Sequence, residues 1–407
     1  MRLAIAVCFL SSFAAVGGEP DTRLKSLYDA HQWFELHDAI QHKKAPALYR
    51  GAVAYAFNDF HQAEVNFRSV IHSAPRSEQA YEAYEGLSHL YFEYGQYRRL
   101  IAVMEERWAA FPHKSEGQNE RTVMASFRGL PDQVSGKPRQ STLHHDGNTF
   151  VPISIDGKPA KYFFDTGAWV NCMSESEAKR LGLSVHESGG TLGTATGAKV
   201  GFRTAVMEEF TAGNIRLRNV SFAVFPDNQE PWSALPVGQR GLLGIPVLLA
   251  FRTLRWTSDG TIEIGANARP KGMRASNLYF DNDHLLLVTD VQKRRVHGLL
   301  DTGAESTDLY EEFTKEFADL VRESGKKDST EVRGVGHAES FDSITLPEVI
   351  FRIGGVDTVL RPAHALLKQF GPKGTVGNFG LDLLKQGRAF RIDLAAMTFE
   401  LERWNRQ

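Results

Sequence analysis

The sequence contains one short motif twice, and this duplication constrains the fold more than any other feature. Residues 163–174 read FFDTGAWVNCMS and residues 299–310 read LLDTGAESTDLY, so two Asp-Thr-Gly-Ala segments, each after an apolar pair, lie 136 positions apart. A single Asp-Thr-Gly tripeptide carries little information. Two copies in equivalent surroundings indicate a chemistry that needs two identical carboxyl groups, Asp165 and Asp301.

The surroundings of the two motifs also repeat. Each motif follows a predicted hairpin, whose turn in the first copy is Asp156-Gly157, and precedes a short helix, a glycine-rich stretch, an apolar-apolar-Gly segment and a closing hairpin. We match Gly244 with Gly377 as the glycines of the apolar-apolar-Gly segments, which places them 79 and 76 residues after Asp165 and Asp301. The repeat predicts one mostly-β lobe used twice.

The order of patterns along the chain predicts a multidomain protein. Its 407 residues, of which 42% are hydrophobic and 24% charged, describe a globular protein with more than one core. Helical periodicity comes first and strand-like alternation follows. The predicted division is a signal peptide at 1–18, an all-α helical domain at 21–115, a linker at 116–142, and mostly-β lobes at 143–270 and 271–407.

The N-terminus has the pattern of a secretory signal peptide. The first seventeen residues, MRLAIAVCFLSSFAAVG, have a basic start, an apolar run and small residues near the end. We therefore predict an exported protein, periplasmic or secreted, with no membrane span after signal removal; the alternative is an uncleaved membrane anchor. Cys172 is the only cysteine beyond this segment, and we predict a buried thiol without a disulfide.

The helical segment repeats small, aromatic and proline positions at intervals that resemble tetratricopeptide repeats. The resemblance implies either a groove that binds a protein partner or a helical cap packed on the next domain, and both interpretations stay open. The positions are Gly51, Ala63, Phe67 and Pro75 in the first copy, and Gly86, Tyr91 and Pro112 in a looser second copy.

A pair of neighbouring carboxyl groups suits water-activated peptide hydrolysis. Two close carboxylates cannot both ionise cheaply, so the pair keeps one proton. The ionised member can take a proton from water while the protonated member donates to the scissile carbonyl oxygen. Hydroxyl groups would tie the two loops together, and glycines would let the backbone turn sharply. These supporting residues are Thr166, Gly167, Thr302 and Gly303.

The region from about 143 to 401 resembles an aspartic protease of the pepsin and retropepsin kind, with two lobes in one chain. The alanines Ala168 and Ala304 after the Asp-Thr-Gly motifs are similar to the retroviral type. The resemblance implies an aspartic endopeptidase that cleaves polypeptides with the dyad Asp165 and Asp301, without metal or cofactor. It also implies that the glycine-rich stretches are flaps over the substrate. The predicted flap residues are Gly193, Thr194, Gly197, Gly334 and Gly336.

The two alanines also bear on the pH range. A Ser or Thr hydroxyl at either position would stabilise an ionised carboxylate and lower its pKa. With Ala168 and Ala304 in these places, we predict activity in the mildly acidic to near-neutral range.

Three other interpretations have less support in the sequence. The lobes could form a catalytically inactive scaffold that binds peptides, with a partner-binding helical domain, but both Asp-Thr-Gly motifs are intact. An actin-like nucleotide site would need Gly and hydroxyl residues straight after the aspartate, and AWVNC and AESTD follow instead. The formal charge of −2 does not indicate the basic surface that nucleic-acid binding usually needs.

Trp232 lies in a polar insertion, and we expect it to cover the core rather than line a subsite.

Overall fold

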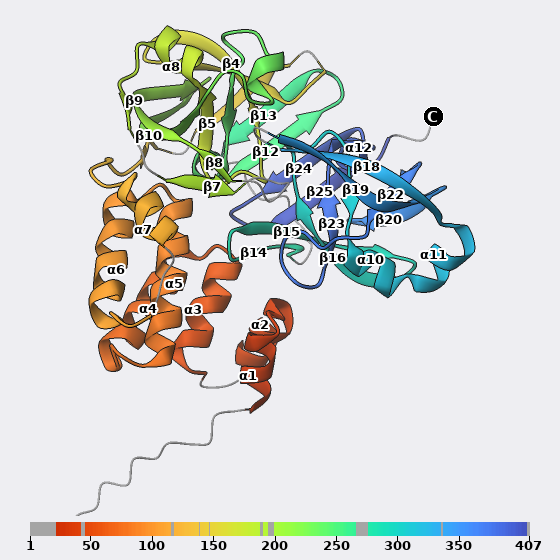
Figure 1. Ribbon diagram of the computed structural model, residues 1–407, viewed down its shortest axis with the longest axis horizontal. Coiled ribbons are helices and arrows are strands. Elements are labelled where there is room, and N and C mark those ends of the chain that lie inside the picture. The colour runs from red at the N-terminus through yellow and green to blue at the C-terminus, as the bar shows by residue number, and fades with distance from the viewer. Residues whose placement is uncertain are drawn as a thin grey trace, which may run out of the picture.

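The computed structural model describes residues 22–41, 45–114, 118–137, 139–145, 147–187, 190–193, 199–265, 276–334 and 337–404. An N-terminal helical domain is followed by two mostly-β lobes, as the sequence predicts (Figure 1). The predicted signal peptide and the predicted boundary between the lobes, at 270 and 271, lie outside the described residues. No helix among the described residues is long and apolar enough to cross a membrane.

The helical domain contains stacked helical hairpins. Phe67 packs between two glycines that face its ring: a Cβ on Gly51 or Gly86 would lie 2.7 or 2.5 Å from ring atoms. A turn at Asn58 and Asp59 joins the two helices of one hairpin, and the Asp59 side chain caps the second of these helices. The domain is therefore built from repeated helical hairpins that pack on one another. The helices are α1 (Thr22–Asp29), α2 (Trp33–Gln41), α3 (Ala47–Ala56), α4 (Phe60–Ser73), α5 (Glu78–Glu93) and α6 (Tyr97–Ala110).

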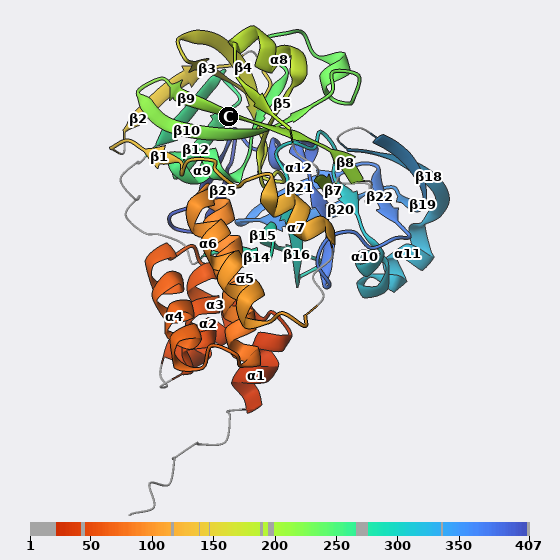
Figure 2. The ribbon, with the colours of Figure 1, turned by 60° about the vertical axis from the view of Figure 1, so that its left-hand side comes forward.

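The segment 116–142, which we expected to be a linker, contains regular structure. It holds α7 (Gln118–Ala125), β1 (Val134–Ser135) and the start of β2 (Gln140–His144). Glu120 of α7 pairs with the buried Arg107 of α6 at 2.5 Å. Phe127 stacks on Tyr97 at 5.1 Å between ring centres. The segment therefore bridges the helical domain and the first lobe, where α7 lies beside β7 (Figure 2).

The first lobe is a closed barrel of six strands in the order β10, β5, β11, β4, β3 and β9, with β9 pairing back to β10. Asp156 and Gly157 form the predicted tight hairpin turn, both with positive φ. Its strands are β3 (Phe150–Ile155), β4 (Lys158–Phe164), β5 (Asn171–Ser174), β6 (Val185–His186), β7 (Thr191–Gly193), β8 (Lys199–Gly201), β9 (Arg203–Ala212), β10 (Ile215–Phe225) and β11 (Gly241–Leu243); its helices are α8 (Glu175–Leu181), η1 (Trp232–Ala234) and α9 (Ile245–Phe251).

The second lobe repeats this arrangement with an open sheet. The sheet runs from β18 through β19, β22, β17, β23, β16, β15 and β20 to β21, and β14 pairs with β15. Its strands are β14 (Leu278–Asp281), β15 (His284–Val291), β16 (Arg294–Leu300), β17 (Asp308–Leu309), β18 (Lys326–Gly334), β19 (His337–Leu346), β20 (Val349–Ile353), β21 (Val356–Leu360), β22 (Ala363–Leu366) and β23 (Thr375–Phe379); its helices are α10 (Glu311–Glu316), α11 (Ala318–Ser324) and α12 (Leu381–Leu384).

The closing hairpins of both lobes join in one sheet. The sheet order is β2, β13 (Thr261–Gly265), β12 (Thr253–Thr257), β24 (Ala389–Asp393) and β25 (Thr398–Glu402). Strands β12 and β24 come from different lobes and pair antiparallel over five residues. This main-chain ladder holds the lobes together, and it lies between them in Figure 1.

The helical domain packs on the second lobe through the turn between β14 and β15. His31 and His89 bind Asp281 and Asp283 of this turn at 2.7 and 2.6 Å. The buried Tyr55 hydroxyl donates to the main-chain oxygen of Asn282 at 2.7 Å. This contact is of the kind that the cap interpretation expects, and a protein partner would need another face of the helical domain.

Candidate active site

Both Asp-Thr-Gly-Ala loops leave the end of a buried strand. Asp165 follows β4 and Asp301 follows β16, and the neighbouring parallel strands are β11 and β23. The main-chain N–H of Asp165 donates to the oxygen of Leu243 at 2.9 Å, and that of Asp301 donates to the oxygen of Phe379 at 3.1 Å. The two lobes thus present their aspartates with the same backbone geometry.

The two loops interlock through their threonines. The Thr166 hydroxyl donates to the oxygen of Leu300 at 2.5 Å and accepts from the N–H of Thr302 at 3.0 Å. The Thr302 hydroxyl donates to the oxygen of Phe164 at 3.0 Å and accepts from the N–H of Thr166 at 3.1 Å. Both threonines are buried, so each loop satisfies polar groups that the other loop would leave unpaired.

Each carboxyl group packs over the glycine of the opposite loop. A Cβ on Gly303 would lie 2.4 Å from Cγ of Asp165, and a Cβ on Gly167 would lie 2.8 Å from Cγ of Asp301. Real Cβ atoms do not approach this closely. Glycine at both positions is therefore what lets the two carboxyl groups reach a common site.

The electrostatics of the pair favour a shared proton. Gly167 donates its N–H to Asp165 at 2.8 Å, and Gly303 and Ala304 donate to Asp301 at 2.9 and 3.1 Å. Burial, and next the nearby Asp301 carboxyl, raise the pKa of Asp165 well above its usual value. A pair of this kind holds a donor and an acceptor side by side. All six residues predicted for the dyad and its support thus meet at this site.

The structure corrects our register between the lobes. Leu243 pairs with Phe164 and Phe379 pairs with Leu300, so the counterpart of Gly244 is Gly380 and not Gly377. Gly380 lies 380 − 301 = 79 residues after Asp301, the same spacing as 244 − 165 = 79 in the first lobe. Sequence matching failed because GTVG and GNFG both place one polar and one apolar residue before a glycine, and only strand pairing chooses between them.

The corrected register brings in a residue that the sequence analysis missed. Asn378, in β23, donates its side-chain amide to the second carboxyl oxygen of Asp301 at 2.7 Å. Asp308, in β17, lies opposite Asn378 in the sheet. With the correct alignment, the sequence would have shown a polar residue here against an apolar Leu242 in the first lobe.

The predicted flaps are hairpins of unequal length. The first is β7 with β8, and Gly193 ends β7. The second is β18 with β19, which pair over nine residues, and Gly334 ends β18. The remaining predicted flap residues, Thr194, Gly197 and Gly336, lie outside the described residues.

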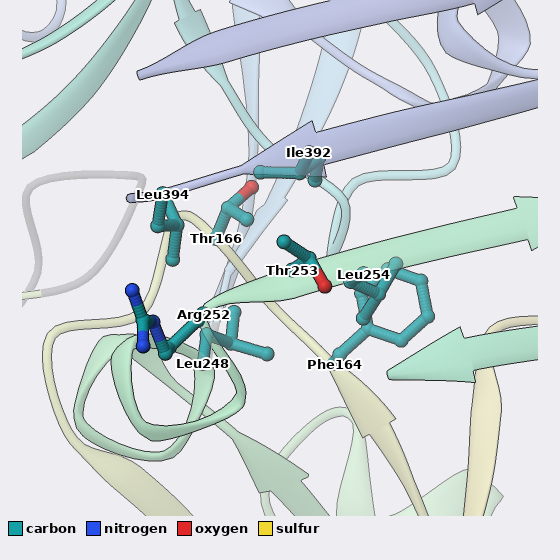
Figure 3. Close-up of a pocket in the computed structure, with 8 residues that line it drawn as sticks. All are labelled: Phe164, Thr166, Leu248, Arg252, Thr253, Leu254, Ile392 and Leu394. Carbon is teal, nitrogen blue, oxygen red and sulfur yellow. The ribbon is translucent and has the colours of Figure 1, made fainter. Parts of the chain in front are cut away.

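A small, mostly apolar cavity lies behind the first loop (Figure 3). Neither aspartate lines it, so it is packing space at the back of the loop rather than the place of a substrate. Among the described residues, no group of three or more His, Cys, Asp or Glu side chains is arranged to hold a metal ion. The lining residues of the cavity are Phe164, Thr166, Leu248, Arg252, Thr253, Leu254, Ile392 and Leu394.

Two predictions about individual side chains are confirmed. Trp232 is fully buried, which fits a residue that covers the core. Cys172 is a buried free thiol in β5, and its burial raises its pKa.

The first lobe is similar to a known protein family. Residues 151–247 match the family model described as aspartyl protease. A crystal structure of a retropepsin-like aspartic protease from Rickettsia conorii is similar to 33% of this chain and 97% of its own, at 16% identity and a TM-score of 0.23. No curated protein sequence matches the chain. Residues 151–247 are thus similar to the aspartyl proteases, and a domain of helical repeats precedes them.

Proposed function

We propose that this protein is an aspartic endopeptidase in which Asp165 and Asp301 activate a water molecule. The observation that carries the proposal is the interlocked pair of loops. The hydroxyls of Thr166 and Thr302 bind across the lobes, and each carboxyl group packs on the opposite glycine. Such preorganisation lets two carboxyl groups act on one bound water without rearranging during the reaction.

The chemistry follows from the shared proton. The ionised carboxylate takes a proton from water, whose oxygen forms a bond to the scissile carbonyl carbon, while the neutral carboxyl group gives its proton to the carbonyl oxygen. The resulting tetrahedral diol collapses as the C–N bond breaks: the leaving nitrogen accepts a proton from one carboxyl group, and a diol hydroxyl gives its proton to the other carboxylate as the carbonyl group forms again. The dyad then again holds one proton.

The raised pKa of Asp165 sets the direction of the pH dependence. Its proton is the one given to the carbonyl oxygen, so activity falls as pH rises through this raised pKa. At low pH both carboxyl groups are protonated and no base remains. We expect an optimum between mildly acidic and neutral pH, and a maximum near pH 2 would contradict the role given to Ala168 and Ala304.

The test is hydrolysis of a mixed peptide library by the purified protein from pH 2 to pH 8, with and without pepstatin. Asp165→Asn and Asp301→Asn should each lower the rate by about 10³-fold or more, because each removes one half of the acid-base pair. Asp319→Asn, on the exposed face of α11, is the matched control and should cleave like the parent. Full activity in either dyad variant would refute the proposal.

Substrate, partner and location belong to the same proposal. We propose that polypeptides are the substrate, that the protein is exported through its N-terminal segment, and that the helical domain, which is similar to tetratricopeptide repeats, offers a face to a protein partner. Peptide binding without cleavage in the library experiment would instead favour a catalytically inactive peptide-binding scaffold.

A further inference from the structure

The two lobes differ at one pair of positions directly beside the aspartates. In the first lobe, Leu242 of β11 pairs with Phe163 on one side and Cys172 on the other. In the second lobe, Asn378 of β23 pairs with Leu299 and Asp308 in the same way. An apolar pair, Leu242 and Cys172, thus stands where the second lobe has the polar pair Asn378 and Asp308.

This difference makes the environments of the two carboxyl groups unequal. Each aspartate accepts main-chain N–H groups from the glycine and alanine of its own loop. Asp301 accepts one more hydrogen bond, from the Asn378 amide to Oδ2 at 2.7 Å. The buried Leu242 has no donor to offer Asp165. A hydrogen bond from an N–H favours the ionised form of a carboxyl group over the neutral form.

We propose that Asn378 is a positioning residue that keeps Asp301 as the carboxylate of the pair and so leaves the shared proton on Asp165. The inference deepens the proposed function and rests on it. Asp301 is then the group that takes the proton from water, and Asp165 is the group that donates to the carbonyl oxygen. The two aspartates therefore have fixed and different roles, although their sequence motifs are identical.

The other titratable groups near Asp301 act against this state. Asp165 and Asp308 are carboxyl groups, and Tyr310 has a phenol whose pKa is raised by its burial and, secondarily, by Asp301. Asp308 itself has a pKa raised to about 6 by burial, Asp382 and Asp301. His364 lies opposite Asp308 in the sheet, where its ring nitrogen pairs with the Thr345 hydroxyl at 3.1 Å.

The carboxyl groups and the phenol among these neighbours bring negative charge or no charge to Asp301. Charge repulsion by itself would therefore favour protonation of Asp301. The amide of Asn378 is the side-chain contact that opposes this tendency.

The deciding experiment is a titration of the full chain with ¹³C-labelled aspartate carboxyl carbons, assigned with Asp165→Asn and Asp301→Asn. In the parent protein, the lower titration step should appear mainly on the Asp301 carbon and the upper step on the Asp165 carbon. Asn378→Leu, which copies the first lobe, should raise the midpoint of the lower step by about one pH unit and divide its amplitude between both carbons. A lower step centred on Asp165, or no change in Asn378→Leu, would overturn the proposal.

The pH profile of kcat/KM gives the second readout. Its acidic limb should move up by about one pH unit in Asn378→Leu, with KM changed by less than about twofold, since the residue does not touch substrate. Leu242→Met is the matched control and should leave the acidic limb in place, because no donor is lost. If Asn378→Leu fails to fold, Asn378→Ala removes the same donor with less bulk, and an unmoved limb in that folded variant counts equally against the proposal.

The two readouts separate this proposal from the proposed function. If the parent cleaves no peptide at any pH, the proposed function fails, yet the carboxyl titration still reports whether Asn378 divides the pair. If the parent cleaves and the titration steps stay on the same carbons in Asn378→Leu, only the role of Asn378 fails.

Discussion

The two lobes share the strand pairings that carry the aspartates and differ in the strands further out. In the first lobe, β9 and β10 are continuous strands of 10 and 11 residues that close the barrel. In the second lobe, β19 and β20 together correspond to β9, and β21 and β22 together correspond to β10. The sheet they belong to is open. The breaks fall at Pro347 and Pro362. Proline has no N–H for the ladder, so it ends a strand where it occurs.

The difference shows which pairings the site depends on. The parallel pairs that carry the aspartates, β4 with β11 and β16 with β23, are present in both lobes. The interrupted strands lie beyond them in the sheet order. Closure of the barrel is therefore dispensable for presenting a carboxyl group, whereas the strand beside each Asp-Thr-Gly loop is not.

The largest expected effect tests the equivalence of the two glycines. Gly303→Ala and Gly167→Ala should each lower kcat/KM by at least about 100-fold, because a displaced carboxyl group loses its alignment with the water. Gly303→Ala should be the more severe, since its Cβ would lie 2.4 Å from a carboxyl carbon against 2.8 Å for Gly167. Asp319→Asn, on the exposed face of α11, is the control. The reverse order of severity would mean that the lobes are not packed as described.

The next effect tests the symmetry of the interlocked threonines. Thr166→Val and Thr302→Val should each lower the free energy of unfolding by about 3 kcal/mol, because a buried N–H and a buried carbonyl lose their partner. Urea denaturation measures both. The serine variants, which keep the hydroxyl, should stay within about 1 kcal/mol of the parent. Clearly unequal losses for the two valine variants would break the equivalence of the loops.

A smaller effect sharpens the contrast between Asp308 and its counterpart Cys172. The pKa of Asp308 is raised from 3.8 to about 6 in the folded protein, so its neutral form stabilises the fold at low pH. This contribution is complete below pH 3.8 and is lost as pH rises through about 6. Between pH 4 and pH 7 the free energy of unfolding of the parent should therefore fall by about 2 kcal/mol, and this decrease should be absent in Asp308→Asn.

The control for this pH dependence comes from the first lobe. Cys172 is uncharged throughout this range because its pKa is raised, so Cys172→Ala should follow the pH dependence of the parent. The measurement is urea denaturation at pH 4, 5, 6 and 7. An identical slope in Asp308→Asn and the parent would show that Asp308 is not the group responsible.

The smallest effect concerns the contact that the second lobe makes with the helical domain. Asp283 raises the pKa of His89 to about 9 against the opposing effect of burial, so the ion pair stabilises the fold below pH 6.5 and is lost above about pH 9. His89 and Asp283 are 30% and 52% exposed, which limits the contribution to about 1 kcal/mol. His89→Gln should lower the melting temperature at pH 7 but not at pH 10. An equal loss at both pH values would point to packing instead of charge.

Local patterns in the sequence determined much of this protein. The repeated motif predicted two lobes and the six residues of the paired loops, because glycine, hydroxyl and carboxyl groups have few uses in that order. Alternation predicted the strands, and Asp156 with Gly157 predicted a turn that needs positive φ. Helical spacing indicated Gly51, Phe67 and Gly86 as repeat positions, and the structure places the ring of Phe67 between the two glycines.

The tertiary structure alone decided what depends on pairing between distant segments. The match of Gly244 with Gly380, the amide of Asn378 on Asp301 and the docking of the β14–β15 turn on α3 and α5 all join residues far apart in the chain. A strand can slide along its neighbour without changing its own pattern of apolar residues, so register is set by the partner strand. The two aspartates were therefore visible in the sequence, but the inequality between them was not.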